Sequence, residues 1–329
     1  MDITLLSERF AIIALNGMRT SNKNYFWRLK SKCITIAKFF DFVLMDIIQE
    51  RDSKVFLNNA SDAFVNTLSE TDRIYLNKLN NRSISSNLIS DMIQVINRLS
   101  SRFNNTVSNE IINSLESKGI LRICPALLSS DLFYHSEGVK LSEYRSSSSH
   151  FNIEIDFIKS EILENSEISD EVIFLIWLLI HSGDLKYICS AEEINNIQNK
   201  INQLYLENKL VHNLFDASLN DTLPIWSAFL KKKKDFAQTK FGSGFVFGNP
   251  YVQRDESIFI DTETMFPDPQ ERIRDVKDRL EANGHHCELI TGTVVPLMKI
   301  DNVLYHLVPH AIRMNKINIH GVRLRRYLV

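Results

Sequence analysis

The chain of 329 residues lacks the patterns that mark several large classes of protein. Its four cysteines lie far apart, without the spacing of a metal site or a redox motif, so we expect reduced thiols in a cytosolic protein. Its net charge of -2 argues against a generally basic coat for nucleic acid. Its first residues, MDITLLSERF, lack the order of a secretory signal, and no apolar run reaches the roughly 20 residues that cross a bilayer. A hydrophobic fraction of 44% still allows a full core.

The strongest local signal is one apolar helix near the middle of the chain. Ser169 is expected to cap it, and Asp170 and Glu171 follow where the helix dipole favours negative charge. Residues 172–180 are apolar on every side, so we predict a helix that is buried all round and ends at Gly183. Such a helix organises a helical domain.

The composition changes near Lys231, and this change predicts two domains. Residues 1–230 are typical of a mainly α domain with a β-hairpin. Residues 235–329 have short strands, turns and one charged helix, Pro269 to Ala282, which predict a small α+β domain. We expect a tight turn at Asp301-Asn302 between two of these strands. The four lysines from Lys231 to Lys234 predict a solvated linker, with contact to an anionic surface as the alternative.

Several segments of residues 1–230, taken in order, resemble the Golgi phosphoprotein 3 family. They are the aromatic Phe26-Trp27, the helix end Lys118-Gly119-Ile120-Leu121, the central helix Leu175 to Leu185 and the closing helix Leu223 to Leu230. The resemblance implies a mostly helical fold with a β-hairpin. It also implies a non-enzymatic protein on a membrane surface, because eukaryotic relatives bind phosphatidylinositol 4-phosphate and the cytoplasmic tails of Golgi glycosyltransferases.

The resemblance further implies a lipid-binding pocket built on a tryptophan and several arginines. Trp27 matches the tryptophan, and Lys38 lies beside the position of one arginine. Asn105 and Ser108 occupy two other arginine positions, so we expect two arginines from one to two turns earlier to take their place. The expected lipid-binding residues are Trp27, Lys38, Arg98 and Arg102. Core packing is the alternative for the tryptophan.

The family's apolar hairpin, which dips into the bilayer, matches residues 125–145. We expect this hairpin to protrude and to reach a membrane or another subunit with its apolar side chains. These are Leu127, Leu128, Leu132, Phe133 and Tyr134. The alternative is a hairpin face that is buried in the core.

The second predicted domain contains residues that bind metals in other proteins: His285, His286, His306, His310, His320, Cys287, Asp261 and Glu263. On one strand, His306 and His310 would lie about 13 Å apart, too far to chelate one ion. Asp261-Thr262-Glu263 imitates the carboxylate pair of DEDD exonucleases, but too little chain follows to complete that fold. We therefore expect no metal, no cofactor and no chemistry in this domain.

The last 28 residues, 302–329, contain no acidic residue. Their basic residues are Arg313, Lys316, Arg323, Arg325 and Arg326. This pattern predicts an edge strand that is guarded by basic side chains. Contact with phosphates of lipid or nucleic acid is the alternative.

The leading prediction is a non-enzymatic, peripheral membrane or adaptor protein of the cytoplasm. It binds an anionic membrane lipid and an unidentified protein partner, and its second domain recognises a partner or mediates self-association. One alternative is a winged-helix-like nucleic-acid-binding protein. Nucleic acid is not expected, because residues 108–117 lack the basic side chains that contact phosphates. Another alternative is an enzyme or nuclease acting through the second domain, but no nucleophile and base have a supporting spacing.

Overall fold

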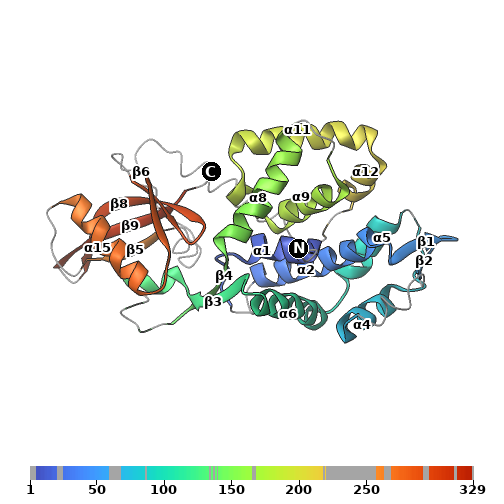
Figure 1. Cartoon of the computed structure of the whole chain (residues 1–329), viewed down its shortest axis with the longest axis horizontal. Helices are drawn as coiled ribbons and strands as arrows, with labels where there is room; N and C mark the ends of the chain where they lie inside the picture. Colours follow the sequence, from blue (N-terminus) through green and yellow to red (C-terminus); the bar gives the residue numbers. More distant parts are fainter. Residues whose placement is uncertain are drawn as a thin grey trace.

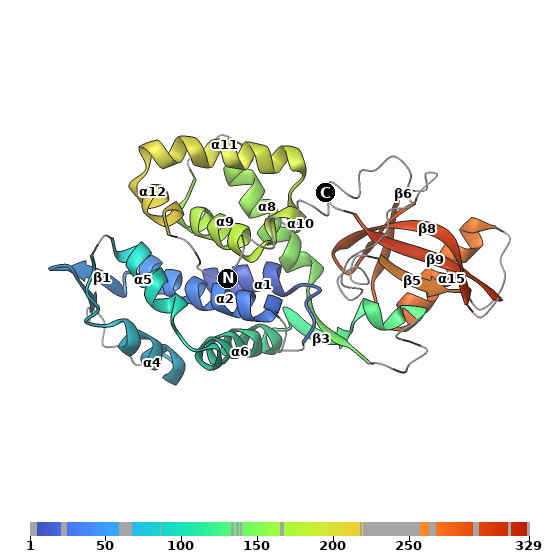
Figure 2. The ribbon, with the colours of Figure 1, turned by 180° about the vertical axis from the view of Figure 1, so that it is seen from behind.

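A helical part and a sheet part lie next to each other in the computed structural model (Figures 1 and 2). The structure describes residues 5–20, 25–58, 68–85, 87–132, 135, 138, 140–164, 168–217, 219, 257–262, 268–291, 296–314 and 317–327. Within these ranges, none of the helices has the length and apolar character needed to cross a membrane. The described fold is mainly α with an α+β part, in agreement with the sequence.

The helical part is built around a central bundle with two small hairpins. Its helices are α1 (Leu6–Leu15), α2 (Tyr25–Leu44), α4 (Glu70–Leu79), α5 (Leu88–Asn97), α6 (Ser101–Ser117), α8 (Ser148–Leu163), α9 (Asp170–Ser182), α10 (Leu185–Ile188), α11 (Ala191–Glu207) and α12 (Lys209–Phe215). Two antiparallel hairpins join β1 (Ile48–Arg51) to β2 (Lys54–Leu57), and β3 (Leu121–Pro125) to β4 (Ser142–Ser146).

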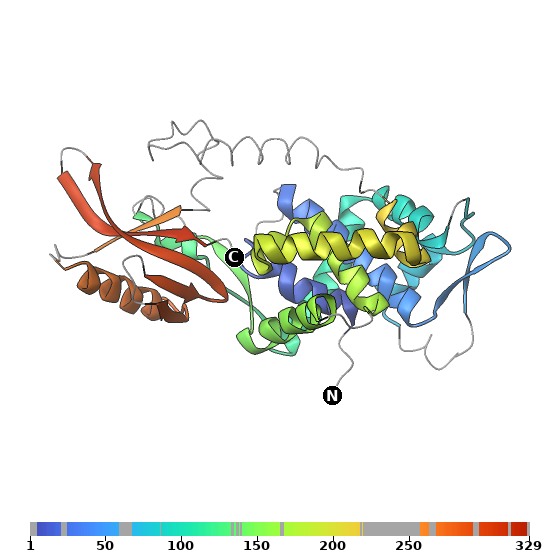
Figure 3. The same ribbon diagram turned by 90° about the horizontal axis from the view of Figure 1, so that it is seen from above.

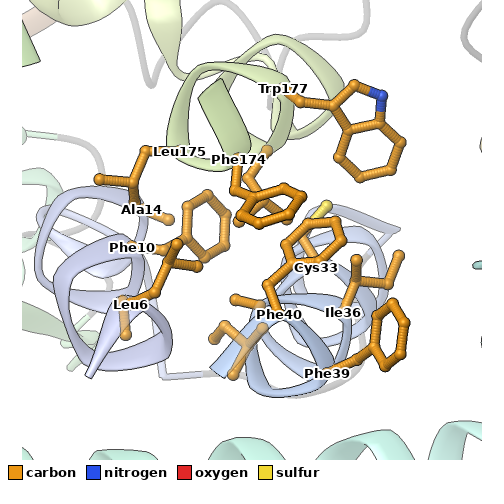
Figure 4. Packing of buried hydrophobic residues seen from close by; sticks show 14 of the residues in the cluster. Leu6, Phe10, Ala14, Cys33, Ile36, Phe39, Phe40, Phe174, Leu175 and Trp177 are labelled. Atoms are coloured by element: carbon orange, nitrogen blue, oxygen red, sulfur yellow. The ribbon is translucent and has the colours of Figure 1, made fainter. Parts of the chain in front are cut away.

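Helix α9 is the predicted central helix, and its ends are confirmed. The Ser169 hydroxyl accepts a hydrogen bond from the Val172 amide at 3.3 Å, and Gly183 ends the helix with a left-handed φ of 77°. Residues 172–179 are buried, while Ile180 is 36% exposed, so the helix is not buried on every side. Aromatic side chains pack α9 against α2: Phe174 stacks on Phe40 with ring centroids 4.1 Å apart (Figure 4).

The sheet part contains β5 (Ser257–Asp261), α15 (Pro269–Ala282), β6 (Cys287–Thr291), β7 (Leu297–Ile300), β8 (Val303–Met314) and β9 (Ile317–Arg326). The strands are antiparallel in the order β5-β9-β8-β7-β6. Helix α15 covers one face, to which it contributes the buried Ile273, Val276 and Leu280. The prediction that the basic strand lies at an edge of the sheet is wrong, because this strand is β9, which lies between β5 and β8.

Local turn chemistry fixes the sheet where β7 turns into β8. Asp301 and Asn302 both have a positive φ, 49° and 73°, as a two-residue hairpin turn requires. The tight turn predicted at this dipeptide is confirmed. So are the limits of α15, which begins after the capping side chain of Asp268 and ends at Asn283 before Gly284.

The connection between β3 and β4 joins the two parts of the molecule. It forms a short 3-10 helix, η1 (Leu127–Ser130), whose Leu127 and Leu128 are each 5% exposed and belong to the core of the sheet part. The expected protruding apolar hairpin is therefore wrong at these two leucines, because the sheet buries them. Leu132 is partly buried, and Phe133 and Tyr134 lie outside the described residues.

The predicted domain limits, 1–230 and 235–329, stay a prediction. The packing of η1 shows that the second core also takes side chains from before that limit. The lysine run and the predicted closing helix, Leu223 to Leu230, lie outside the described residues.

Candidate functional site

The predicted lipid pocket does not form around Trp27. This side chain is fully buried, its Nε1 donates a hydrogen bond to Asn105 Oδ1 at 2.9 Å, and its ring stacks near Tyr144 with centroids 6.2 Å apart. Burial of a large ring with its N–H satisfied is what core packing requires. The expectation of a surface pocket at Trp27 is therefore wrong.

The other predicted pocket residues lie apart from Trp27. Lys38 lies three turns further along α2, about 16 Å away along the axis. Its Nζ pairs with Asp72 Oδ1 at 3.1 Å. Arg98 at the end of α5 and Arg102 on α6 are exposed, whereas the tryptophan is sealed. The four residues do not build one headgroup site.

A buried polar cluster at the join was missed by sequence reasoning. Arg145 of β4 is 3% exposed, and its Nη2 lies 2.9 Å from Asp301 Oδ2 and 2.9 Å from His285 Nδ1. Its Nη1 donates to the Gly284 carbonyl at 3.0 Å. Burial raises the pKa of the neighbouring Glu143 carboxyl, and the Arg145 charge opposes that rise.

This cluster is sealed from solvent and connects the two parts, so it acts as a structural clamp. The His285 ring, expected among metal-ligand types, instead lies 2.7 Å from Asp301 Oδ2 through its Nδ1. Among the residues that the structure describes, no group of three or more histidine, cysteine or acidic side chains is arranged to hold a metal ion. Glu263 of the predicted carboxylate pair lies outside those residues.

Positive charge gathers on the hairpin of β8 and β9, where Arg325 is exposed and Arg323 is half-buried. Along β9, Arg323 and Arg325 alternate with buried residues that face α15, so both arginines face the other side of the sheet. The pairing register puts His306 and His310 of β8 on that same side. We call these four residues the basic face.

Contacts within the basic face hold its side chains over the sheet. The Arg323 guanidinium donates to Ser257 Oγ at 3.3 Å and lies 5.9 Å from the centroid of the buried Phe259 ring. His310 meets the same ring edge-on at 6.2 Å. The basic face is therefore ordered by β5, which pairs with β9 beneath it.

The electrostatics of the basic face disfavour additional positive charge. Burial lowers the pKa of His310, and the charges of Arg323 and Arg325 lower it further. Burial also lowers the pKa of Arg323, with a further lowering from Arg325, while the carboxylate of Asp131 acts in the opposite direction. An anion bound here would relieve this repulsion.

The tip of the hairpin extends past the strands on either side. Pairing with β7 ends at His306 and pairing with β5 begins at Gly321, so within the described residues the tip strands pair only with each other. We define the tip as residues 312–314 and 317–319. It carries Ile317, which is 66% exposed, beside the exposed Arg313, and it points away from the helical part (Figure 3).

Comparison with protein-family models and with curated proteins finds no match for this chain. The resemblance to the Golgi phosphoprotein 3 family stays a prediction from the residues that suggest it.

Proposed function

We propose that the protein is a non-enzymatic peripheral membrane adaptor of the cytoplasm, and that it binds anionic lipid surfaces through the β8–β9 hairpin. The observation that carries the proposal is the basic face with an exposed apolar tip beside it. Guanidinium groups bind phosphate oxygens through several hydrogen bonds at once, so Arg323 and Arg325 suit lipid headgroups. The lipid contact is thus proposed on the sheet part and no longer at Trp27.

The size of the effect follows from charge and apolar area. A basic side chain near an anionic membrane contributes about 1 kcal/mol, so Arg323 and Arg325 together contribute about 2 kcal/mol, or about 30-fold in affinity. Ile317 adds apolar area at the level of the headgroups. Such a surface binds a membrane reversibly, and its affinity falls as the salt concentration rises, as for other peripheral proteins.

The same observations favour a lipid surface over single-stranded nucleic acid. Stacking of bases requires exposed aromatic rings. Phe259 on this face is only 5% exposed beneath Arg323 and His310, and Tyr327, 38% exposed beside His306, is a single ring that gives no platform for successive bases. An exposed isoleucine at a tip has a partner in a membrane but none in a phosphate backbone.

The finer fold and the adaptor role belong to the same proposal. We infer that the helical part is a Golgi phosphoprotein 3-like domain, supported by the capped and largely buried α9 and by the short β1–β2 hairpin after α2. A protein partner would bind the helical part while the sheet part contacts the membrane. Self-association through the sheet part is the alternative route to an assembly.

Vesicle flotation tests the lipid contact. Wild-type protein is expected to float with vesicles that contain anionic lipid and to stay behind with neutral vesicles. The double variant Arg323→Ala/Arg325→Ala should lose about 30-fold in affinity. The matched control Arg274→Ala/Lys277→Ala removes the same charge from α15, on the opposite side of the sheet, and should float like wild type.

Equal flotation of both double variants would refute the proposal. Tight binding of single-stranded RNA that the Arg323→Ala/Arg325→Ala variant loses, without flotation of the wild type, would favour the nucleic-acid alternative instead.

A further inference from the structure

A cleft separates the helical part from the turn between β7 and β8 and from the end of β9. The space open to the centres of water molecules is about 70 Å³, several times the volume that one buried water needs. Apolar walls come from Ile13 of α1, Phe151 of α8 and Leu304 of β8. Three polar groups in the lining distinguish this cleft from a packing gap.

The first polar group is the carboxylate of Asp184, at the start of α10. The residue is 6% exposed, and its Oδ1 accepts a hydrogen bond from Lys30 Nζ at 2.8 Å. Its Oδ2 is buried and has no hydrogen-bond partner among the described residues. A buried carboxylate oxygen without a donor is unfavourable, so a ligand that donates there gains the full benefit of the bond.

The second group is the side-chain amide of Asn302 in the β7–β8 turn. Its Nδ2 donates to the Ser146 carbonyl at 2.9 Å and to Asn16 Oδ1 at 3.3 Å. These two bonds fix the orientation of the amide, so its Oδ1 must be the acceptor that remains. That Oδ1 is buried, and no described residue forms a hydrogen bond with it.

The third group is the guanidinium of Arg326, near the end of β9. It lies over the Tyr187 ring, 3.8 Å from the centroid, which holds it in the lining of the cleft. Side chains alternate between the two faces along a strand, so Arg326 faces the side of the sheet opposite Arg323 and Arg325. No ion pair joins it to a carboxylate within the part of the chain that the structure describes.

We propose that this cleft binds a small zwitterion. Its ammonium group donates to Asp184 Oδ2 and Asn302 Oδ1, its oxyanion is held by Arg326, and its apolar part lies against Ile13 and Phe151. Free amino acids have this chemistry with a carboxylate, and phosphoethanolamine has it with a phosphate. The site is separate from the basic face, so the test of ligand binding does not depend on whether the basic face binds a membrane.

Titration calorimetry on the full chain with four probes tests the site. The probes are L-leucine, leucinamide, N-acetyl-leucine and phosphoethanolamine. Leucinamide lacks the oxyanion and N-acetyl-leucine lacks the ammonium, so each should bind about 10-fold more weakly than L-leucine. Tighter binding of phosphoethanolamine than of L-leucine would support the same site with phosphate as the anion.

Two variants separate a binding role from a structural one. Arg326→Gln should weaken the binding of L-leucine about 10-fold and leave the binding of leucinamide unchanged, because leucinamide has no anion for the guanidinium. Arg313→Gln, the same substitution at the hairpin tip, should change neither. Vesicle flotation of Arg326→Gln should equal that of wild type.

The proposal is overturned if none of the four probes binds at about 10 mM, the weak limit for a specific small ligand. It is equally overturned if Arg326→Gln weakens leucinamide as much as L-leucine, since the arginine would then only shape the cleft.

Discussion

Replacing Arg145 by methionine should uncouple the sheet part from the helical part. The change keeps most of the side-chain volume but removes the charge that faces Asp301 and Glu143. It also removes the hydrogen bond to the Gly284 carbonyl. What remains is the Asp301 carboxylate in a site where its side chain is 8% exposed, with His285 as its neighbour.

The magnitude follows from the burial of the pair. Removing one partner of a buried ion pair costs about 3–5 kcal/mol, because the other charge stays buried and unpaired. The Arg145 side chain is 3% exposed, so water cannot replace it without opening the join. The loss is therefore expected near the middle of that range, about 4 kcal/mol, in the free energy of unfolding of the sheet part.

Urea unfolding followed by circular dichroism measures this loss. Lys277→Met is the matched control, because Lys277 forms an exposed pair with Glu281 at 3.7 Å and its loss should cost under about 0.5 kcal/mol. Asp301→Asn added to Arg145→Met should restore part of the stability, since asparagine tolerates the left-handed backbone and carries no charge. If Arg145→Met costs less than about 1 kcal/mol, the cluster is not a clamp and the reasoning fails.

Three further outcomes follow from the structure. Burial raises the pKa of Asp41 to about 7 against hydrogen bonds from Ser7, so its ionisation destabilises the folded state. The contribution of this carboxyl to the free energy of unfolding is therefore fully present below pH 3.8 and is lost as pH rises through about 7. Asp41→Asn should remove this pH dependence in urea titrations at several pH values. Vesicle binding should strengthen as pH falls below 6.5, the ordinary pKa of histidine, and His310→Ala should weaken this response in flotation at pH 7 and in acid. Gly321→Ala should destabilise the sheet by about 1–3 kcal/mol in urea unfolding, because the added methyl meets the backbone of Ile260 and Asp261.

Sequence reasoning succeeded where the determinants are local. The cap at Ser169, the stop at Gly183 and the turn at Asp301-Asn302 each depend on a few neighbouring residues, and the structure confirms them. The strands of the sheet part were predicted for the same reason. Their order was not, because the identity of a strand says nothing about which strand lies beside it, and β9 lies inside the sheet.

The failures concern contacts between distant parts of the chain. A tryptophan fits a pocket or a core equally well by sequence, and the packing of α2 against α6 and of Tyr144 against the ring buries Trp27. The leucines of η1 are apolar in either environment, and the distant sheet decides that they are buried. Arg145 and His285 are 140 positions apart, so no spacing rule brings them together.

Tryptophan fluorescence at the hairpin tip tests the central claim most directly. Ile317→Trp places a reporter at a side chain that is 66% exposed, and Ile153→Trp places one at an equally open isoleucine of α8, 62% exposed. With anionic vesicles, the emission at position 317 should shift to the blue and be quenched by brominated lipid, whereas position 153 should not respond. An unchanged emission at position 317 on protein that floats with the vesicles would contradict the account, because the membrane would then be bound by another surface.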